Sequence, residues 1–150
     1  VLEQGTDELG PIGHGWTYSA HPIGAAAGVA NLQLVDKMNL VSNAREVGKY
    51  LLDELKNALD SHPLVGEVRG DGMLASLEFL ENKESLKFFD PAKKIGMQVS
   101  ANLLKEGVIG RAMPHGDILG LAPPLCLSRS EADIIVSSLK KSVDKVHSEI

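Results

Sequence analysis

The sequence has a single cysteine and no long apolar run, and each absence excludes a class of protein. Cys126 is the one cysteine in 150 residues, so neither an internal disulfide nor a CxxC motif for zinc or thiol exchange can form. No run of about 18 apolar residues occurs, which excludes a transmembrane helix. The five histidines are too scattered to form a metal-ligand set. We therefore expect a cytoplasmic protein with no metal and no membrane role.

An excess of positive charge is also lacking. The 15 Lys and Arg residues are outnumbered by 20 Asp and Glu residues, which gives a formal net charge of −5. A nucleic-acid-binding surface needs basic residues that neutralise phosphates, so the charge balance argues against this class. With 43 % hydrophobic residues, the composition is typical of one soluble globular domain with a sizeable core.

The first 22 residues have no apolar period, and we predict a loop there. This stretch has neither the basic region nor the apolar region of a signal peptide. Because the chain starts with Val1 rather than Met, we expect a fragment of a longer protein.

Helical spacing of apolar residues predicts two helices after this loop. Pro22 suits a first helical turn, and the stretch that follows keeps a helical period to about residue 38. Its many small side chains allow close approach, so this helix is expected to pack against a partner domain or another subunit. Asn39 is a candidate N-cap for a second helix, which should end at Ser61-His62-Pro63. One stripe of the second helix carries Ala44, Val47, Leu51, Leu55, Ala58 and Leu59.

A period of two then predicts a β-hairpin. Residues 64–69 and 73–80 read as strands, and Gly70-Asp71-Gly72 reads as the tight turn between them. Polar residues 81–89 follow as a loop.

The remaining residues predict two helices and two more strands. Asp90-Pro91 is expected to cap and begin a helix that Gly107 closes, and strands are expected at 108–112 and 118–121. Capping-box spacing over residues 128–131 begins the last helix. Hairpins with helices on one face indicate an α+β fold with an antiparallel sheet. No strand-loop-helix GxGxxG motif for a Rossmann unit is present.

Arg111 is the most informative single residue. It lies inside the apolar stretch 108–112, where burial of a guanidinium is costly unless the group faces a cleft or an anion. Such an arginine can bind a carboxylate through two parallel hydrogen bonds. Two other interpretations remain open: Arg111 lies on the solvent side of the sheet, or it pairs with Asp117 across the turn at 113–117.

Residues 14–22, HGWTYSAHP, are a second candidate site. Hydroxyls and backbone N–H groups beside a helix start can bind a phosphate, because the helix N-terminus is electropositive. Alternatively, Ser19 or Thr17 only caps the helix. Cys126 lies among apolar residues and is expected to be an inert, packed thiol.

Three separated motifs together resemble one family. HGWTYSAHP, VRGDGMLASLEFL and GVIGRAMPHGDILGLAPPLCLSRSEAD resemble the C-terminal portion of class III pyridoxal-phosphate-dependent aminotransferases, the omega-transaminase group. The resemblance implies a fold-type I homodimer. Residues 1–38 would be the end of the large domain and an interdomain helix, with an active-site loop at 13–22, and residues 39–150 would be the C-terminal small domain.

The resemblance also implies roles for three residues. Thr17 would hydrogen-bond the phosphate of the cofactor, pyridoxal 5'-phosphate (PLP), held by the other subunit, and the backbone N–H of Trp16 would meet the same phosphate. Arg111 would bind the carboxylate of an amino-acid or oxo-acid substrate, and would swing away when an apolar amine enters. Ala20 stands where the family usually has glycine.

The Schiff-base lysine of the family lies upstream of these motifs and is absent from this chain. No catalytic residue is therefore expected here, and the chain alone should be inactive. The resemblance implies that the full-length parent moves an amino group between an amine or amino acid and an oxo acid such as pyruvate. Two alternatives remain: a non-catalytic binding or dimerisation module, and a PLP-dependent aminomutase or racemase of the same family.

Overall fold

The computed structural model describes residues 2–11, 13, 15–115 and 117–150. His14 of the first motif and Gly116 of the turn at 113–117 lie outside the described residues. The elements in chain order are α1 (Leu2–Leu9), α2 (Pro22–Lys37), α3 (Leu40–Leu59), β1 (Val65–Asp71), β2 (Leu74–Phe79), the 3-10 turn η1 (Pro91–Lys93), α4 (Ile95–Lys105), β3 (Arg111–Ala112), β4 (Ile118–Leu121) and α5 (Arg129–Glu149).

The strands form one four-stranded sheet in the order β1-β2-β4-β3, and each neighbouring pair is antiparallel. Successive residues of a strand point to opposite faces. In β2 the residues Ala75, Leu77 and Phe79 are buried, and the residues between them are exposed or half-buried. The predicted hairpin is confirmed.

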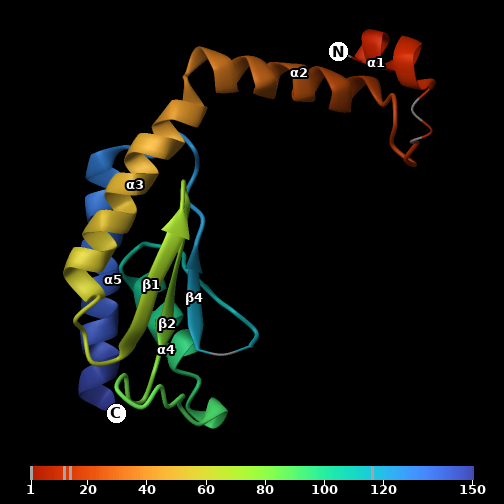
Figure 1. Ribbon diagram of the computed structural model, residues 1–150. Coiled ribbons are helices and arrows are strands. Elements are labelled where there is room, and N and C mark those ends of the chain that lie inside the picture. Colours follow the sequence, from red (N-terminus) through yellow and green to blue (C-terminus); the bar gives the residue numbers. More distant parts are fainter. Residues whose placement is uncertain (1, 12, 14, 116) are drawn as a thin grey trace.

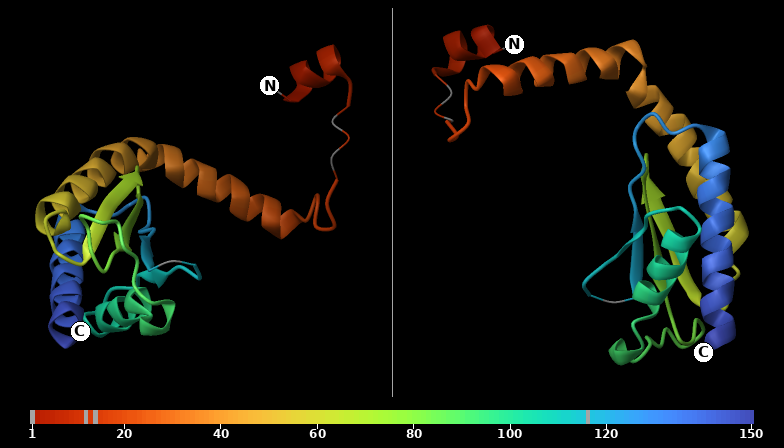
Figure 2. Two further views of the ribbon diagram at one scale, coloured as in Figure 1. Left: turned by 60° about the horizontal axis from the view of Figure 1, so that its bottom comes forward. Right: turned by 180° about the vertical axis from the view of Figure 1, so that it is seen from behind.

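Helices cover one face of this sheet only (Figures 1 and 2). Seen from behind, α4 lies in front of the strands and α5 runs along their side in front of α3, whereas the strands are in full view from the opposite side. The core lies between these layers, so the predicted α+β fold is confirmed. Its fully buried large side chains are Phe79, Leu51, Leu55, Leu59, Leu77, Ile95, Leu103, Leu119, Leu139, Val65, Val99 and Val143.

The predicted cap of the last helix is present. The Ser128 hydroxyl accepts a hydrogen bond from the Glu131 backbone N–H, and the Glu131 carboxylate accepts one from the Ser128 N–H at 2.8 Å. Asn43 of α3 donates hydrogen bonds to the carbonyls of Leu125 and Leu127, at 2.7 and 3.0 Å. These hydrogen bonds connect α3 to the segment just before α5.

The helix α2 projects away from the rest of the chain as an arm (Figure 1). None of its residues is buried, and Ile23 and Leu32 are 75 % and 66 % exposed. The Gly- and Ala-rich helix predicted from the sequence is therefore present, and its apolar side chains are uncovered within this chain.

The predicted loop over the first 22 residues is partly wrong, because Leu2–Leu9 form a helix. The sequence contains its stop signal: Gly10 has a φ of 82° and its N–H donates to the Thr6 carbonyl, and Pro11 follows. The side chains of Gln4 and Glu8 are hydrogen-bonded one helical turn apart.

The helix predicted from Asp90-Pro91 onward is divided in two. The Asp90 carboxylate does cap a turn, but this turn is the short η1. Lys94 then has a φ of 50°, which interrupts the helical path, and α4 begins at Ile95. Asn39 precedes α3 as predicted, but its φ is also 50° and its side chain makes no capping hydrogen bond.

Two strand boundaries also differ from the prediction. Gly70 and Asp71 pair with Ala75 and Leu74 inside the hairpin, so the turn is Gly72-Met73. β3 is shorter than residues 108–112 and begins at Arg111, and the carbonyl of the preceding Gly110 accepts a hydrogen bond from the Ser100 hydroxyl of α4 at 2.6 Å.

Candidate functional site

Arg111 lies on the sheet face that the helices leave uncovered. It is exposed at the start of β3, and its partner across the strand is Gly120 of β4. The Arg111 guanidinium is therefore not buried in the apolar core, the position that would be costly in free energy. The guanidinium is instead on the solvent side of the sheet, in agreement with one of the alternatives.

The second alternative, a pair between Arg111 and Asp117, is not found. The Asp117 carboxylate accepts a hydrogen bond from the Gly96 N–H at 2.9 Å, at the first turn of α4. Among the described residues, no carboxylate forms an ion pair with Arg111. Its guanidinium is thus available to an external anion.

Arg111 borders a shallow hollow of about 490 Å³ on this face. Arg69 lies at the hollow as well, but its Nη1 donates to Glu67 and Glu78, at 2.5 and 2.9 Å. These hydrogen bonds, the one to Glu78 above all, raise the pKa of the Arg69 guanidinium. Of the two guanidinium groups, Arg111 is therefore the one that remains without a carboxylate.

The second predicted site is a compact double turn before α2. The carbonyls of Trp16 and Tyr18 accept hydrogen bonds from the N–H groups of Ser19 and His21, at 2.9 and 3.3 Å. Ala20 has a φ of 61°, a conformation that glycine adopts more readily. This conformation would suit the glycine that the resemblance implies for this position.

The cap of α2 is His21, not Ser19 or Thr17. The His21 Nδ1 accepts a hydrogen bond from the Gly24 N–H at 3.1 Å. Ser19 Oγ accepts the Trp16 N–H at 2.8 Å, so this N–H already has a partner inside the turn. Thr17 is exposed beside them, and its hydroxyl is not required to cap the helix.

The two parts of the predicted site lie apart. Trp16 and Thr17 precede the far end of the α2 arm, whereas Arg111 lies on the sheet (Figures 1 and 2). One copy of this chain therefore does not bring the phosphate-binding and carboxylate-binding candidates together.

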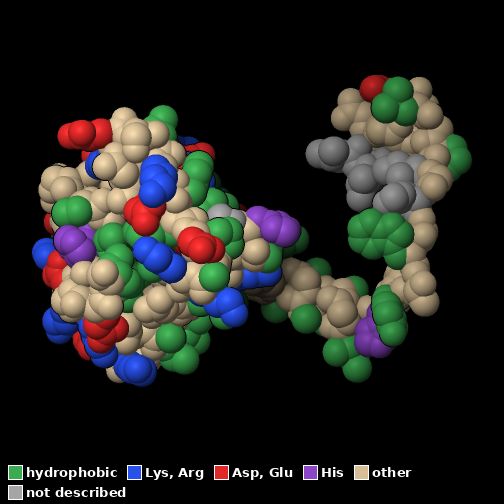
Figure 3. Space-filling view, turned by 90° about the horizontal axis from the view of Figure 1, so that it is seen from below, with side chains coloured by type: hydrophobic (Ala, Val, Ile, Leu, Met, Phe, Trp, Pro, Cys, Tyr) green, Lys and Arg blue, Asp and Glu red, His purple; other side chains and the backbone are tan. Residues whose placement is uncertain are grey.

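The residues of this turn fit only one end of PLP. A threonine hydroxyl and backbone N–H groups next to a helix start can hold its phosphate. Residues 1–36 contain neither Lys nor Arg, and in Figure 3 the Lys and Arg side chains gather on the body of the molecule while the arm shows hydrophobic and His side chains. This segment thus has hydrogen-bond donors of the kind that bind a phosphate, but no lysine amine that could bond to the cofactor.

Three further expectations from the sequence can be compared with the structure. Cys126 is exposed rather than packed, because it lies in the turn that the Leu127 N–H and the Pro124 carbonyl close at 3.0 Å. The described residues contain no group of three metal-binding side chains. None of the described helices combines the length and apolar character needed to cross a membrane.

Sequence reasoning missed the neighbours of Arg111 on the sheet. Ser76 and Gly120 line the same hollow, and each lies on a different strand. Only the strand register brings them beside Arg111, and register cannot be read from separate motifs.

Comparison with known proteins places the chain in a family. The family described as aminotransferase class-III matches residues 3–143. The diaminobutyrate–2-oxoglutarate transaminase of Halomonas elongata is 53 % identical over 97 % of this chain, which spans 31 % of that protein.

Solved structures give the same result. A transaminase from directed evolution by ancestral reconstruction has a TM-score of 0.89 and 54 % identity, over 99 % of this chain and 33 % of that one. An amine transaminase from an uncultivated Pseudomonas species, solved in its PLP-bound form, has a TM-score of 0.81 and 36 % identity, over 95 % and 31 % of the two chains. Omega-transaminases are among the structural neighbours. The chain is therefore a member of the class III, PLP-dependent aminotransferases, matched to about a third of the length of its relatives.

Proposed function

We propose that this chain is the C-terminal part of an aminotransferase that moves an amino group between an amine or amino acid and an oxo acid such as pyruvate. Its role is to hold the cofactor phosphate and the substrate carboxylate. The observation that carries the proposal is the exposed Arg111 guanidinium, which borders a hollow and forms no ion pair with a described residue. The name of the Halomonas relative, which includes 2-oxoglutarate, supports a carboxylate-bearing substrate.

The division into domains belongs to the same proposal. Residues 1–38 end the large domain and residues 39–150 form the small domain. The apolar residues of α2 support this division, because they are uncovered here and need a further surface to pack against. We propose a homodimer in the cytoplasm, in which Thr17 and Trp16 of one subunit reach the cofactor of the other. For the Trp16 N–H to bind the phosphate, it has to exchange its hydrogen bond with the Ser19 hydroxyl for one with the phosphate.

PLP, when bound, supplies an electron sink for the transfer of the amino group. The Thr17 hydroxyl donates a hydrogen bond to the cofactor phosphate and fixes the cofactor in place. Arg111 donates two parallel hydrogen bonds to the substrate carboxylate and so orients the carbon that carries the amine. Neither residue moves a proton, so this segment contributes binding and positioning.

The test of the Arg111 role is Arg111→Ala in the full-length enzyme. Activity toward amino acids and oxo acids should fall about 10- to 150-fold in kcat/KM, as expected for loss of a charge-assisted hydrogen bond of about 1.5–3 kcal/mol. Activity toward a carboxylate-free amine, measured in the amine half-reaction, should be retained.

Two control variants sharpen this test. Arg111→Lys keeps the charge but loses the two parallel hydrogen bonds, and should give an intermediate loss. Arg45→Ala removes an exposed arginine from α3 and should change neither activity. Equal losses toward both substrate types in Arg111→Ala would remove the carboxylate role.

The test of the Thr17 role is Thr17→Ala. Loss of one hydrogen bond to a charged phosphate should raise the Kd of PLP by about tenfold or more. Retention is measured by dialysis followed by the absorbance of the remaining cofactor. Thr17→Ser keeps the hydroxyl and should retain PLP, and Tyr18→Phe, which removes a neighbouring exposed hydroxyl, should also retain it. Unchanged retention in Thr17→Ala would refute the role.

A further inference from the structure

The strand register places four residues in one row across the uncovered face of the sheet. Arg69 pairs with Ser76, Ser76 pairs with Gly120, and Gly120 pairs with Arg111. Directly paired residues of an antiparallel sheet point to the same face. The row therefore has a guanidinium at each end, and a hydroxymethyl group and a glycine between them.

Neither the backbone nor the packing explains why residue 120 is a glycine. Its φ lies outside the left-handed region. A Cβ built on Gly120 would lie 3.6 Å from the Met113 Sδ and 3.7 Å from the Arg111 carbonyl, which are ordinary contact distances. By contrast, a Cβ on Gly48 or Gly70 would lie 2.0 or 2.3 Å from backbone oxygens.

A glycine inside a strand is unfavourable for stability. At residue 120 the structure shows one effect of the missing side chain, which is open space beside Arg111. The hollow that both residues line is bordered mainly by apolar side chains. Leu74, Ile109 and Met113 are 64 %, 84 % and 41 % exposed there.

This combination suits a ligand with a charged head and an apolar body. The Arg111 guanidinium offers the binding group for a carboxylate. The neighbouring apolar walls gain free energy when they cover methylene groups. A side chain on Gly120 would point into the same space, because Gly120 shares the uncovered face with Arg111.

We propose that Gly120 is a specificity-determining residue, whose missing side chain leaves room for the alkyl part of a carboxylic acid bound at Arg111. The proposal rests on the proposed function, since it takes Arg111 as the carboxylate-binding residue. The substrate class is then amino acids and oxo acids that carry an unbranched alkyl segment. The size of residue 120 sets the length that is accepted.

The experiment measures binding of unreactive acids to the full-length enzyme by calorimetry, with acetate, propionate, butyrate and valerate as probes. In the unmodified enzyme, each added methylene that enters the hollow should lower Kd by about fourfold. In Gly120→Leu the isobutyl group fills this space, and Kd should stay within about twofold of the acetate value along the series. Gly120→Ala, whose Cβ fits without a clash, should lose only part of the gain.

Ile118→Leu is the matched control. Ile118 lies on the same strand and the same face as Gly120 but does not line the hollow. This variant should therefore keep the full decrease of Kd along the acid series. Melting temperatures show whether each variant is folded. If Gly120→Leu does not fold, the graded loss in Gly120→Ala decides the question.

The outcomes separate this inference from the proposed function. The role of Gly120 would be overturned if Kd does not fall along the acid series in the unmodified enzyme, or if both Gly120 variants keep the full fall in Kd. This holds even if Arg111→Ala abolishes binding of every acid. Unchanged binding of acetate by Arg111→Ala would overturn the carboxylate role of Arg111, and with it this proposal.

Discussion

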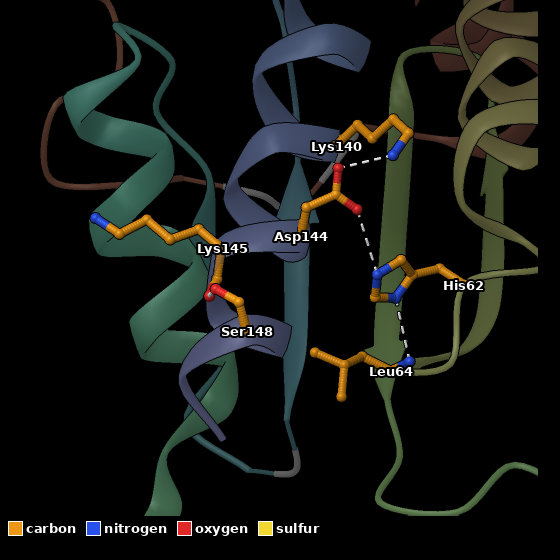
Figure 4. Close-up of polar contacts among 6 residues, drawn as sticks. All are labelled: His62, Leu64, Lys140, Asp144, Lys145 and Ser148. Carbon is orange, nitrogen blue, oxygen red and sulfur yellow. Dashed lines mark hydrogen bonds and ion pairs between the residues drawn. The ribbon is translucent and has the colours of Figure 1, made fainter.

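His62 connects the segment before β1 to the helix α5 (Figure 4). Its Nδ1 accepts a hydrogen bond from the Leu64 N–H at 3.1 Å, and its Nε2 lies 3.5 Å from the Asp144 carboxylate of α5. The His147 ring packs edge-on against it, with 5.1 Å between the ring centres. Because Nδ1 is an acceptor here, the neutral ring carries its proton on Nε2.

This environment favours the neutral ring. Burial, and next the proximity of His147, lower the pKa of His62 below its ordinary value of 6.5, and the nearby Lys140 adds to this. Asp144 acts in the opposite direction but does not reverse the shift. The unfolded chain therefore binds a proton on His62 at a higher pH than the folded chain does.

The linkage predicts a stability that depends on pH. The contribution of neutral His62 is fully present above pH 6.5 and is lost as pH falls from 6.5 through the lowered pKa of the folded state. His62→Gln cannot titrate, so its free energy of unfolding should change less over this range. Urea unfolding of both chains at pH 7.5 and at pH 5 tests this.

His115→Gln provides the control, since it removes an imidazole ring from an exposed position in the turn at 113–117. The free energy of unfolding of this variant should depend on pH as it does in the unmodified chain. If His62→Gln keeps the same dependence as well, another group is responsible, and His147 is the first to be examined because its ring faces His62.

At the residue scale, the sequence indicated which residue types carry chemistry but not what surrounds them. The sequence predicts a functional role for Arg111, because a guanidinium in an apolar stretch is costly to bury unless it faces a cleft or an anion. In the structure Arg111 does border a hollow. Cys126 was expected to be packed because its neighbours are apolar, yet a turn exposes it. Local sequence reports polarity, whereas exposure depends on the path of the chain.

At the element scale, α3 and the hairpin are in unusually close contact. A Cβ on Gly48 of α3 would lie 2.0 Å from the carbonyl oxygen of Gly72, at the hairpin turn. The contact is between two backbones, so no side chain can rotate away to make room. Glycine at position 48 is thus a packing requirement, although it reduces the helix propensity of α3.

Gly48→Ala should therefore lower the free energy of unfolding by at least about 1–3 kcal/mol, the range found for overpacked cores. Gly28→Ala is the control, because a Cβ on Gly28 of α2 would meet nothing within 4 Å. This second variant should be neutral or stabilising by up to about 1 kcal/mol. Denaturant unfolding of both variants compares them, and equal stabilities would contradict the close approach.

The elements themselves were predictable where the apolar period is long. The stripe of α3 and the alternation of β2 are strong signals, and both are confirmed. Shorter signals failed: Gly10-Pro11 was not recognised as the stop of α1, and Lys94 divides the predicted helix after Asp90 through a backbone conformation that its residue type does not indicate.

At the scale of the whole molecule, one face of the sheet and the whole of α2 are uncovered. The sequence predicted that the Gly- and Ala-rich helix needs a partner surface, and its exposed apolar residues agree with this. It could not place the 16–20 turn relative to Arg111, because few contacts link the arm to the sheet. Such a position depends on surfaces outside this chain.

Because α2 is long, a small change of angle at the bend at Asn39 would move its far end over a large distance. The residue has a φ of 50° and joins two long helices without a side-chain cap. The 16 residues of α2 extend over about 24 Å, so a swivel of ~10° at Asn39 would carry the Thr17 end through ~4 Å. A small change in the backbone angles of one residue would therefore displace Thr17 by more than the length of a hydrogen bond.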